Sequence, residues 1–193
     1  MDSGDNVAGV HIDPETRTPR AQPDRTGSQS PASRPEMTED TRTATGVQIA
    51  ALPLRWDDKG ALRVLMVTSR GTGRWIMPKG WRMDVKKPWR TAEIEALEEA
   101  GALGRVGTAP IGRYRYDKIL DNGTALPCVV EVFPMLVERL KRDWKERRQR
   151  KRRWFKARAA ARRVDEPDLA ALLLELADKP RKRPEIRALR KAS

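Results

Sequence analysis

The chain has 193 residues, of which 38% are hydrophobic and 35% are charged, and its formal net charge is +13. This length suits one domain with flanking segments, and the charge favours polyanionic ligands. Cys128 is the only cysteine and His11 the only histidine, which excludes an internal disulfide, a cysteine-based zinc site and a histidine-dependent catalytic triad.

Residues 1–43 are rich in Pro, Ser, Thr and charged residues and show almost no apolar clustering. Such a segment cannot bury enough apolar surface to offset its chain entropy, so we expect a disordered tail. The first residues lack the basic and apolar regions of a secretory signal. No apolar run approaches the roughly 20 residues of a membrane span. These features lead us to expect a cytoplasmic protein.

The folded domain is expected at residues 44–178. Residues 47–54 and 62–68 are apolar runs typical of strands, and the turn sequence Asp-Asp-Lys-Gly at 57–60 lies between them. The two runs therefore predict a hairpin. A short extended piece is expected at 75–77, before a loop that contains a Lys-Gly pair.

A helix is predicted from Pro88, which suits a first helical turn, up to Gly101, which suits the position after a helix. Glu95, Glu98 and Glu99 are spaced so that they share one face of this helix. Like charges this close repel one another, whereas a bound Mg²⁺ ion, which prefers oxygen ligands, would stabilise them. The same spacing is most often only a solvated face, so the pattern by itself leaves both interpretations open.

Further strands are predicted at 107–116 and 128–137, and the Asp-Asn-Gly sequence at 121–123 indicates a tight hairpin turn. Four leucines at helical spacing predict a helix from residue 166 or 167 to 177. Residues 179–193 are basic and poor in apolar residues, so a frayed basic tail is expected there. Strands and helices in this order predict an α/β fold, a sandwich with a mixed sheet.

The segment from Pro78 to Gly101 resembles the box of the Nudix hydrolase family. That box reads Gly, five residues, Glu, seven residues, Arg-Glu, an apolar residue, any residue, Glu-Glu, any residue, Gly and an apolar residue. Aligned on Gly80, the chain matches at Glu95, Ala96, Glu98, Glu99, Gly101 and Ala102. It departs at Lys86, where the box has its first Glu, and at Ile94, where the box has Arg. In the family these two residues commonly support each other and orient the catalytic helix.

The resemblance extends from about Thr45 to Leu176. It includes the sequences GRWIMPKGW, YRYDK followed by DNG, and RRWF with VDEP downstream. These pieces look most similar to the bacterial relatives of diphosphoinositol polyphosphate and diadenosine polyphosphate hydrolases.

The resemblance implies a Nudix-type α/β/α sandwich that hydrolyses a diphosphate linkage in a nucleoside or inositol polyphosphate. The implied cofactor is Mg²⁺, with Mn²⁺ as the alternative. Glu98 and Glu99 are expected to hold the metal, and Glu95 to act as a further ligand or as the base that orients water. The Gly80 carbonyl is expected to complete the metal site.

Basic residues around this predicted site are expected to bind the substrate phosphates: Arg70, Arg74, Lys79 and Lys118. Arg offers a planar fork that matches phosphate oxygens, and Lys contributes a compact charge. Taken singly, each of the four is also compatible with plain surface charge.

Residues 139–163 hold fourteen Lys or Arg residues against two acids, Asp143 and Glu146. Together with the departures from the box at Lys86 and Ile94, this run leads to an alternative hypothesis, a catalytically weak Nudix-fold module that binds RNA or nucleotides through the basic segment. Charge runs are usually solvated faces. We expect Trp154 and Phe155, within the run, to pack in the core where a strand begins, since buried aromatic side chains contribute large apolar areas.

Overall fold

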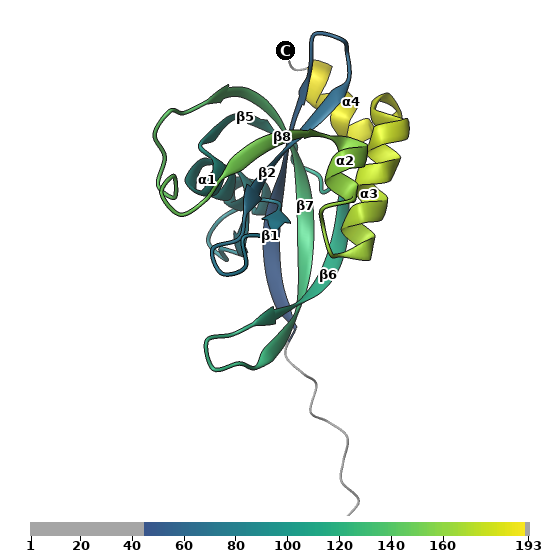
Figure 1. Ribbon diagram of the computed structural model, residues 1–193. Coiled ribbons are helices and arrows are strands. Elements are labelled where there is room, and N and C mark those ends of the chain that lie inside the picture. The colour runs from purple at the N-terminus through teal and green to yellow at the C-terminus, as the bar shows by residue number, and fades with distance from the viewer. Residues whose placement is uncertain (1–44, 192–193) are drawn as a thin grey trace, which may run out of the picture. The chain divides into compact units, whose positions relative to one another are not determined.

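The computed structural model describes residues 45–191 (Figure 1), so the tail predicted at 1–43 lies outside the described residues. The strands are β1 Gly46–Trp56, β2 Leu62–Thr68, β3 Trp75–Ile76, β4 Lys79–Trp81, β5 Ala102–Val106, β6 Gly112–Ile119, β7 Ala125–Leu140 and β8 Arg152–Lys156. The α-helices are α1 Pro88–Ala100, α2 Ala157–Ala161, α3 Pro167–Asp178 and α4 Pro184–Lys191, with a 3₁₀ helix η1 at Pro180–Lys182.

The strands form one mixed sheet around the long strands β1 and β7. Its main order is β3-β2-β1-β7-β5, while β4 pairs with β1, β6 with β7, and β8 with β2. β1 and β7 run parallel from the pair Gly46–Cys128 to the pair Leu54–Leu136, and the other pairings are antiparallel. A parallel pair requires a long crossover, and the chain between β1 and β7 includes α1.

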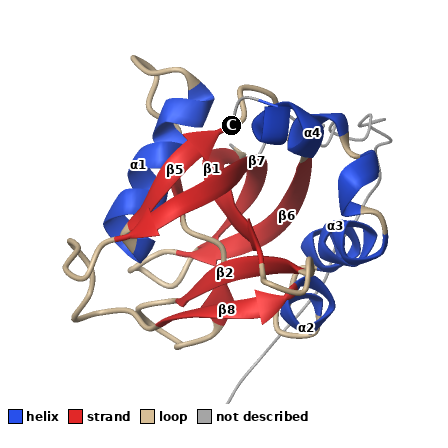
Figure 2. Ribbon diagram, turned by 90° about the horizontal axis from the view of Figure 1, so that it is seen from above, coloured by secondary structure: helices blue, strands red, loops and turns tan. Residues whose placement is uncertain are grey.

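Helices cover both faces of the sheet, as Figure 2 shows from above. Alternate residues of β1 point to opposite faces, so Ile49 and Ala51 join the core beneath α1, while Leu52 and Leu54 join the core beneath α3. The predicted α/β/α sandwich with a mixed sheet is confirmed.

Both predicted turns form as their sequences indicate. At the first, the Asp57 carboxylate accepts hydrogen bonds from the backbone of Lys59 and Ala61, and Gly60 takes a positive φ of 74°. At the second, Gly123 has φ 80° and the side chain of Asn122 accepts a hydrogen bond from Thr124. Asx side chains and glycine favour these conformations locally, which is why short sequences predict them.

The strand predicted at 107–116 is wrong in its bounds. The structure has β5 before this segment and β6 overlapping its second half, with a loop at 107–111 between them. β7 has 16 residues and pairs with both β5 and β6 along its length. This division depends on the long partner strand and not on the local sequence.

The frayed tail expected at 179–193 is also wrong for its described part, because η1 and α4 form there. Ile186 and Leu189 are three residues apart, share one helical face and are both buried. Ile186 belongs to the same core cluster as Leu169 and Leu173 of α3. Two apolar residues are therefore enough to dock a short helix that is otherwise charged.

Candidate functional site

A cleft of about 1100 Å³ lies between α1, the loop after β2, the turn end of the β6–β7 hairpin and the loop after β7. All eight residues that the sequence singled out line it: Arg70, Arg74, Lys79, Gly80, Glu95, Glu98, Glu99 and Lys118. The fold therefore brings the predicted carboxylates and cations to one place.

Small residues position α1 against the sheet. Ala92, Ala96 and Ala100 are fully buried, which allows the helix to approach closely and leaves its glutamates on the cleft side. The helix ends at Gly101, whose φ of 61° is left-handed. A Cβ atom at Gly101 would lie 3.0 Å from the side chain of Trp144, so glycine is required here for both conformation and space.

Gly80 allows the β4 loop to contact the helix. A Cβ atom at this position would overlap the Glu95 carboxylate. The neighbouring backbone N–H of Lys79 donates a 3.1 Å hydrogen bond to Oε2 of Glu99. The Gly80 backbone therefore lies against the carboxylate face of α1.

Glu99 is buried and forms an ion pair with the equally buried Arg150. The same guanidinium donates from Nε to Glu146 at 2.5 Å and from Nη1 to the carbonyl of Thr68 at 2.8 Å. Burial raises the pKa of Glu99 to about 7, although the Arg150 charge and the Lys79 N–H act in the opposite direction.

Glu95 and Glu98 are more accessible to the cleft. Burial raises the pKa of Glu95, and the nearby charges of Glu98 and Glu146 raise it further. Glu98 accepts a 2.6 Å hydrogen bond from Lys145, whose side chain is largely exposed. Exposed ion pairs contribute about 0–1 kcal/mol, so this pair opens easily.

Carboxylate oxygens at this cleft have the chemistry that Mg²⁺ or Mn²⁺ prefers. Burial, and then the nearby charges of Glu98 and Glu146, raise the pKa of Glu95, and a bound cation would favour its charged form. Glu95, Glu98 and Glu99 line the cleft and supply oxygen donors of the kind such an ion takes. Among residues 45–191, however, no group of three or more acidic, His or Cys side chains is gathered around one point. Arg150 and Lys145 instead hold Glu99, Glu146 and Glu98.

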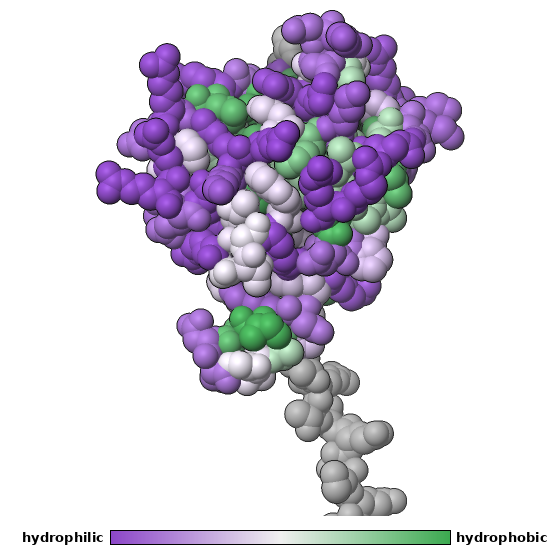
Figure 3. Space-filling view, in the orientation of Figure 1, coloured by the Kyte–Doolittle hydropathy of each residue, from purple (hydrophilic) through white to green (hydrophobic). Residues whose placement is uncertain are grey.

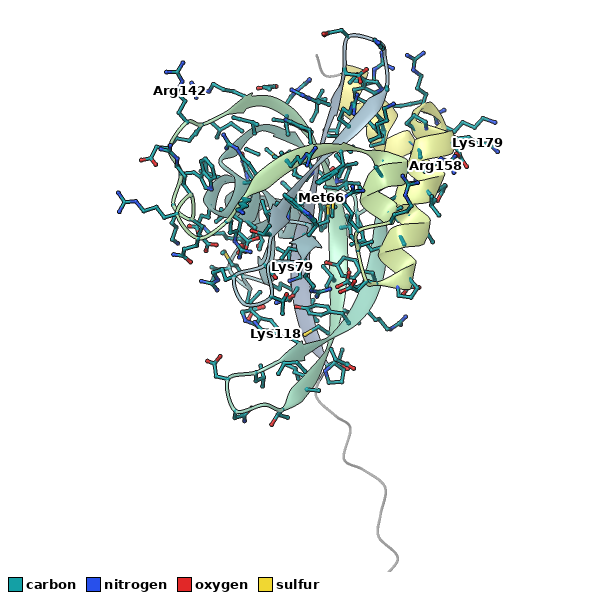
Figure 4. All side chains as sticks on the ribbon, in the orientation of Figure 1. Met66, Lys79, Lys118, Arg142, Arg158 and Lys179 are labelled. Atoms are coloured by element: carbon teal, nitrogen blue, oxygen red, sulfur yellow. The ribbon has the colours of Figure 1, made fainter. Side chains whose placement is uncertain are left out.

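Two of the predicted phosphate ligands lie over aromatic rings. The ammonium group of Lys79 is 4.8 Å from the ring centre of Tyr116, and that of Lys118 is 4.5 Å from the ring centre of Trp81. Figure 4 shows Lys79 near the centre of the domain and Lys118 below it, close to the β6–β7 hairpin. Burial lowers the pKa of Lys79, while the charge of Glu99 raises it.

Arg70 and Arg74, the two predicted arginines, differ in how firmly acidic residues hold them. Arg74 lines the cleft, but its guanidinium pairs with Asp165 at 3.1 Å and with the buried Glu166 at 2.9 Å. Arg70 is largely exposed, and its closest acid is Glu146 at 3.9 Å. Arg70 is therefore better placed than Arg74 to meet a new anion.

Sequence reasoning did not assign Glu146, Arg150, Tyr116 or Trp81 to the site. The sequence offers one indication of Glu146, since it is one of only two acids within a basic run. Arg150 had none, because one buried arginine cannot be recognised among thirteen other basic residues. The structure thus buries one residue of the basic run inside the cleft.

The rest of the basic segment divides between structure and surface. β8 begins at Arg152, Phe155 is buried and Trp154 is half-buried, which confirms that the aromatic residues pack. Arg142 points away from the domain in Figure 4. The face seen in Figure 3 is mostly hydrophilic, with an apolar group at the β6–β7 hairpin, where Ile119 is exposed. No helix among the described residues is long and apolar enough to cross a membrane.

Comparison with known proteins points to one family. No family model matches the chain. It is 31% identical over 102 residues to Nudix hydrolase 12, mitochondrial, of Arabidopsis thaliana, covering 51% of this chain and 50% of the relative. It is 31% identical over 99 residues to diphosphoinositol polyphosphate phosphohydrolase 3-beta of Homo sapiens, covering 50% and 56%. The chain thus spans about half the length of the curated relatives it matches.

Solved structures share the fold. A NUDIX hydrolase from Nitrosomonas europaea aligns with a TM-score of 0.54 and 23% identity, covering 76% of this chain and 96% of that one. The MutT protein from Methanosarcina mazei Go1 aligns with a TM-score of 0.52 and 15% identity, covering 72% and 98%. The sequence similarity to curated Nudix hydrolases over about half of the chain and the shared fold lead to one conclusion: the chain has the Nudix fold and is similar to the Nudix hydrolase family.

Proposed function

We propose that this protein hydrolyses a diphosphate linkage in a nucleoside or inositol polyphosphate with the help of a divalent cation, Mg²⁺ or Mn²⁺. One observation carries the proposal. Three glutamates of α1 and the Gly80 loop line the same cleft as several basic side chains. Relatives named diphosphoinositol polyphosphate phosphohydrolases support the substrate class.

The glutamates supply the ligands and the proton acceptor in this proposal. Glu98 and Glu99, with the Gly80 carbonyl, would hold the cation. When bound, Mg²⁺ lowers the pKa of a coordinated water and neutralises charge on the phosphoryl oxygens. Glu95 is the candidate general base, because its raised pKa suits a carboxylate that takes a proton from water. Glu95 as a further ligand is the alternative role.

Lys79, Lys118 and Arg70 would orient the substrate phosphates. Their cationic groups surround the same cleft, and Arg70 and Lys118 have no acid held at short hydrogen-bonding distance among the described residues. Phosphoryl transfer depends mainly on positioning and charge stabilisation, which such groups provide. Arg74 is proposed to act differently, by fixing the loop after β2 to Asp165 and Glu166.

A panel of diphosphates tests the proposal. The purified chain is incubated with Mg²⁺ or with EDTA and with nucleoside diphosphates, dinucleoside polyphosphates and diphosphoinositol polyphosphates, and the products are separated and quantified. We expect turnover of at least one class that requires the cation. Absence of turnover on the entire panel, by protein that remains folded, would contradict the proposal.

A second candidate is a Nudix-fold module that binds nucleotides or RNA with little turnover. It is favoured by the ion pairs of Arg150 and Lys145, which engage glutamates that a metal ion would use. The panel separates the two candidates, because a binding module would bind these compounds without releasing products.

A further inference from the structure

Arg150 is a buried cation inside the carboxylate cleft. Its side chain is 5% exposed and is held by three groups from three parts of the chain: Glu99 of α1, Glu146 of its own loop and the carbonyl of Thr68 at the end of β2. An arginine that only solubilised the surface would not be buried or triply anchored. Arg150 therefore places a fixed positive charge among the carboxylates of the cleft.

Basic residues already occupy several of the carboxylates that a divalent cation would use. Six carboxylates and five basic side chains line the cleft, so its formal charge is −1. Four of the carboxylates are those of Glu95, Glu98, Glu99 and Glu146; Arg150 pairs with Glu99 and Glu146, and Lys145 pairs with Glu98. A second divalent cation would have to displace one of these two basic residues.

The two basic residues differ in how easily they can leave. Lys145 is largely exposed and contacts Glu98 alone among these four carboxylates, so it can swing into water at little cost. Arg150 would have to abandon two carboxylates and a backbone carbonyl and leave Glu99 buried without its partner. Breaking one side of a buried ion pair is strongly unfavourable, so Arg150 stays.

We propose that Arg150 is a fixed internal cation that takes the place of a second divalent ion, so that the cleft binds a single one. The inference rests on the proposed function in assuming that the cleft binds a divalent cation at all. Glu98, Glu99 and the Gly80 carbonyl hold the one ion, while Arg150 engages Oε1 of Glu99 and the Glu146 carboxylate, which a second ion would need. The lack of a ready three-carboxylate group among residues 45–191 agrees with this division.

The sequence of α1 explains why an arginine from a distant loop is needed. Ile94 precedes Glu95 and brings no charge to the helix, and Arg90 forms its ion pair with Glu93 at 2.5 Å. The guanidinium that contacts Glu99 therefore comes from the loop after β7. Arg150 acts as a positioning residue for the carboxylates and does not need to touch the substrate.

Mn²⁺ binding in the absence of substrate tests the inference. The number of bound ions is counted by electron paramagnetic resonance and by calorimetric titration. We expect one Mn²⁺ per chain for the unaltered protein and two for Arg150→Met, which removes the charge but retains a long apolar side chain. Arg150→Lys keeps the charge, and we expect it to bind one.

Arg152→Met is the matched control. Arg152 lies two residues away and is also partly buried, but its guanidinium donates to the backbone carbonyls of Ala100 and Lys141 and stacks on Trp144. No carboxylate partner of Arg152 occurs in the part of the chain that the structure describes. We expect this variant to bind one Mn²⁺.

A double variant keeps the test decisive if Arg150→Met unfolds. Arg150→Met with Glu99→Gln removes both charges of the buried pair, so the fold should tolerate it better, and we expect it to bind one Mn²⁺. Without Mn²⁺, Arg150→Met should melt at a lower temperature than the double variant, and Mn²⁺ should raise its melting temperature more than that of the unaltered protein.

Two results overturn the inference and leave the proposed function intact: two Mn²⁺ ions on the unaltered protein, or one ion with unchanged affinity on Arg150→Met. Failure of every form, including the unaltered protein, to bind Mn²⁺ would instead contradict the cation dependence of the proposed function. Mn²⁺ binding by the unaltered protein therefore distinguishes failure of this inference from failure of the proposed function.

Discussion

Glu98 and Glu99 are adjacent in sequence but occupy different environments. Glu98 pairs with a lysine at the surface, whereas Glu99 is buried between the Lys79 backbone and the Arg150 guanidinium. Substitution of either residue should affect catalysis, but only one substitution should also affect the fold. The two variants therefore report on different properties.

Glu98→Gln should reduce turnover by at least about 100-fold, equivalent to about 3 kcal/mol of transition-state stabilisation, because a ligand charge is lost. Its unfolding midpoint in urea should stay close to that of the unaltered protein. Glu99→Gln should lose a similar amount of activity and about 1–3 kcal/mol of stability, since Arg150 then has one buried charge fewer to pair with. Near-normal rates for both variants at moderate Mg²⁺ would disprove the metal assignment.

The departures from the box at Lys86 and Ile94 allow a second prediction. Lys86 is exposed in the loop before α1, and Ile94 is half-buried on the helix. The double variant Lys86→Glu with Ile94→Arg should raise the rate if the new charges meet, and each single change should help less, because an unpaired buried charge is costly. Rates are compared at saturating Mg²⁺. A double variant slower than both singles would show that the local geometry has diverged from the family.

At the scale of elements, contact between α1 and the β4 loop depends on a glycine. In Gly80→Ala the new methyl group would displace the Glu95 carboxylate, which is the flexible end of a side chain. Turnover should fall about 100-fold, since displacement of a catalytic group by about 1 Å has this effect. Stability should change by less than about 1 kcal/mol.

Gly71→Ala is the control for this variant, because a methyl group there meets nothing within 4 Å. Thermal melts and initial rates of both variants are compared with those of the unaltered protein. A normal rate for Gly80→Ala would mean that the position of Glu95 does not matter for catalysis.

The docking of α4 gives a prediction about stability. Ile186 is almost fully buried against the core that includes α3, so Ile186→Ala should cost about 2–5 kcal/mol of unfolding free energy. Ile119→Ala is the matched control, since Ile119 is 65% exposed and should change stability by less than about 0.5 kcal/mol. Urea unfolding measures both. Equal small effects would indicate that α4 is not docked in solution.

At the scale of the whole molecule, the net charge is +13, but only some of the basic residues in 139–163 are available to bind another molecule. Arg150 is buried, Lys145 pairs with Glu98, and Arg158 pairs with Asp178. The basic residues that can bind a polyanion are the exposed residues of the loop between β7 and β8. A test of polyanion binding must leave Arg150 untouched, because its loss would also disturb the cleft.

If the exposed loop recruits RNA, the affinity should fall steeply as salt rises, since each neutralised phosphate releases counterions. Four substitutions to Ser should reduce the slope of log affinity against log salt by up to about 3, at about 0.7 per contact on a single strand. Hydrolysis of a small nucleotide diphosphate should be spared. The four residues are Lys141, Arg142, Arg148 and Lys151, all of them exposed.

Four exposed basic residues elsewhere serve as the control for charge alone: Lys59, Lys87, Arg181 and Lys182. Fluorescence anisotropy with a single-stranded RNA at several salt concentrations measures both sets. The same change of slope for both sets would mean that the loop contributes only general charge.

The sequence by itself determined the features that arise from local chemistry. Helix α1 has its predicted bounds because Pro88 starts and Gly101 stops it, and its three glutamates share a face because helical spacing requires it. The turns at Gly60 and Gly123 follow from the conformations that these residues favour. The box therefore indicated where the cleft would lie before any tertiary contact was known.

Only the tertiary structure decided which charges meet. Arg150 reaches Glu99 across 51 positions of sequence, and Arg74 reaches Glu166 across 92. Neither pairing has a local signature, because the loop after β7 and the start of α3 are brought to the cleft by packing on the sheet. The parallel pairing of β1 with β7 has the same origin. Periodicity and turn chemistry act within a few residues, whereas the partner of a buried charge is set by the fold that surrounds it.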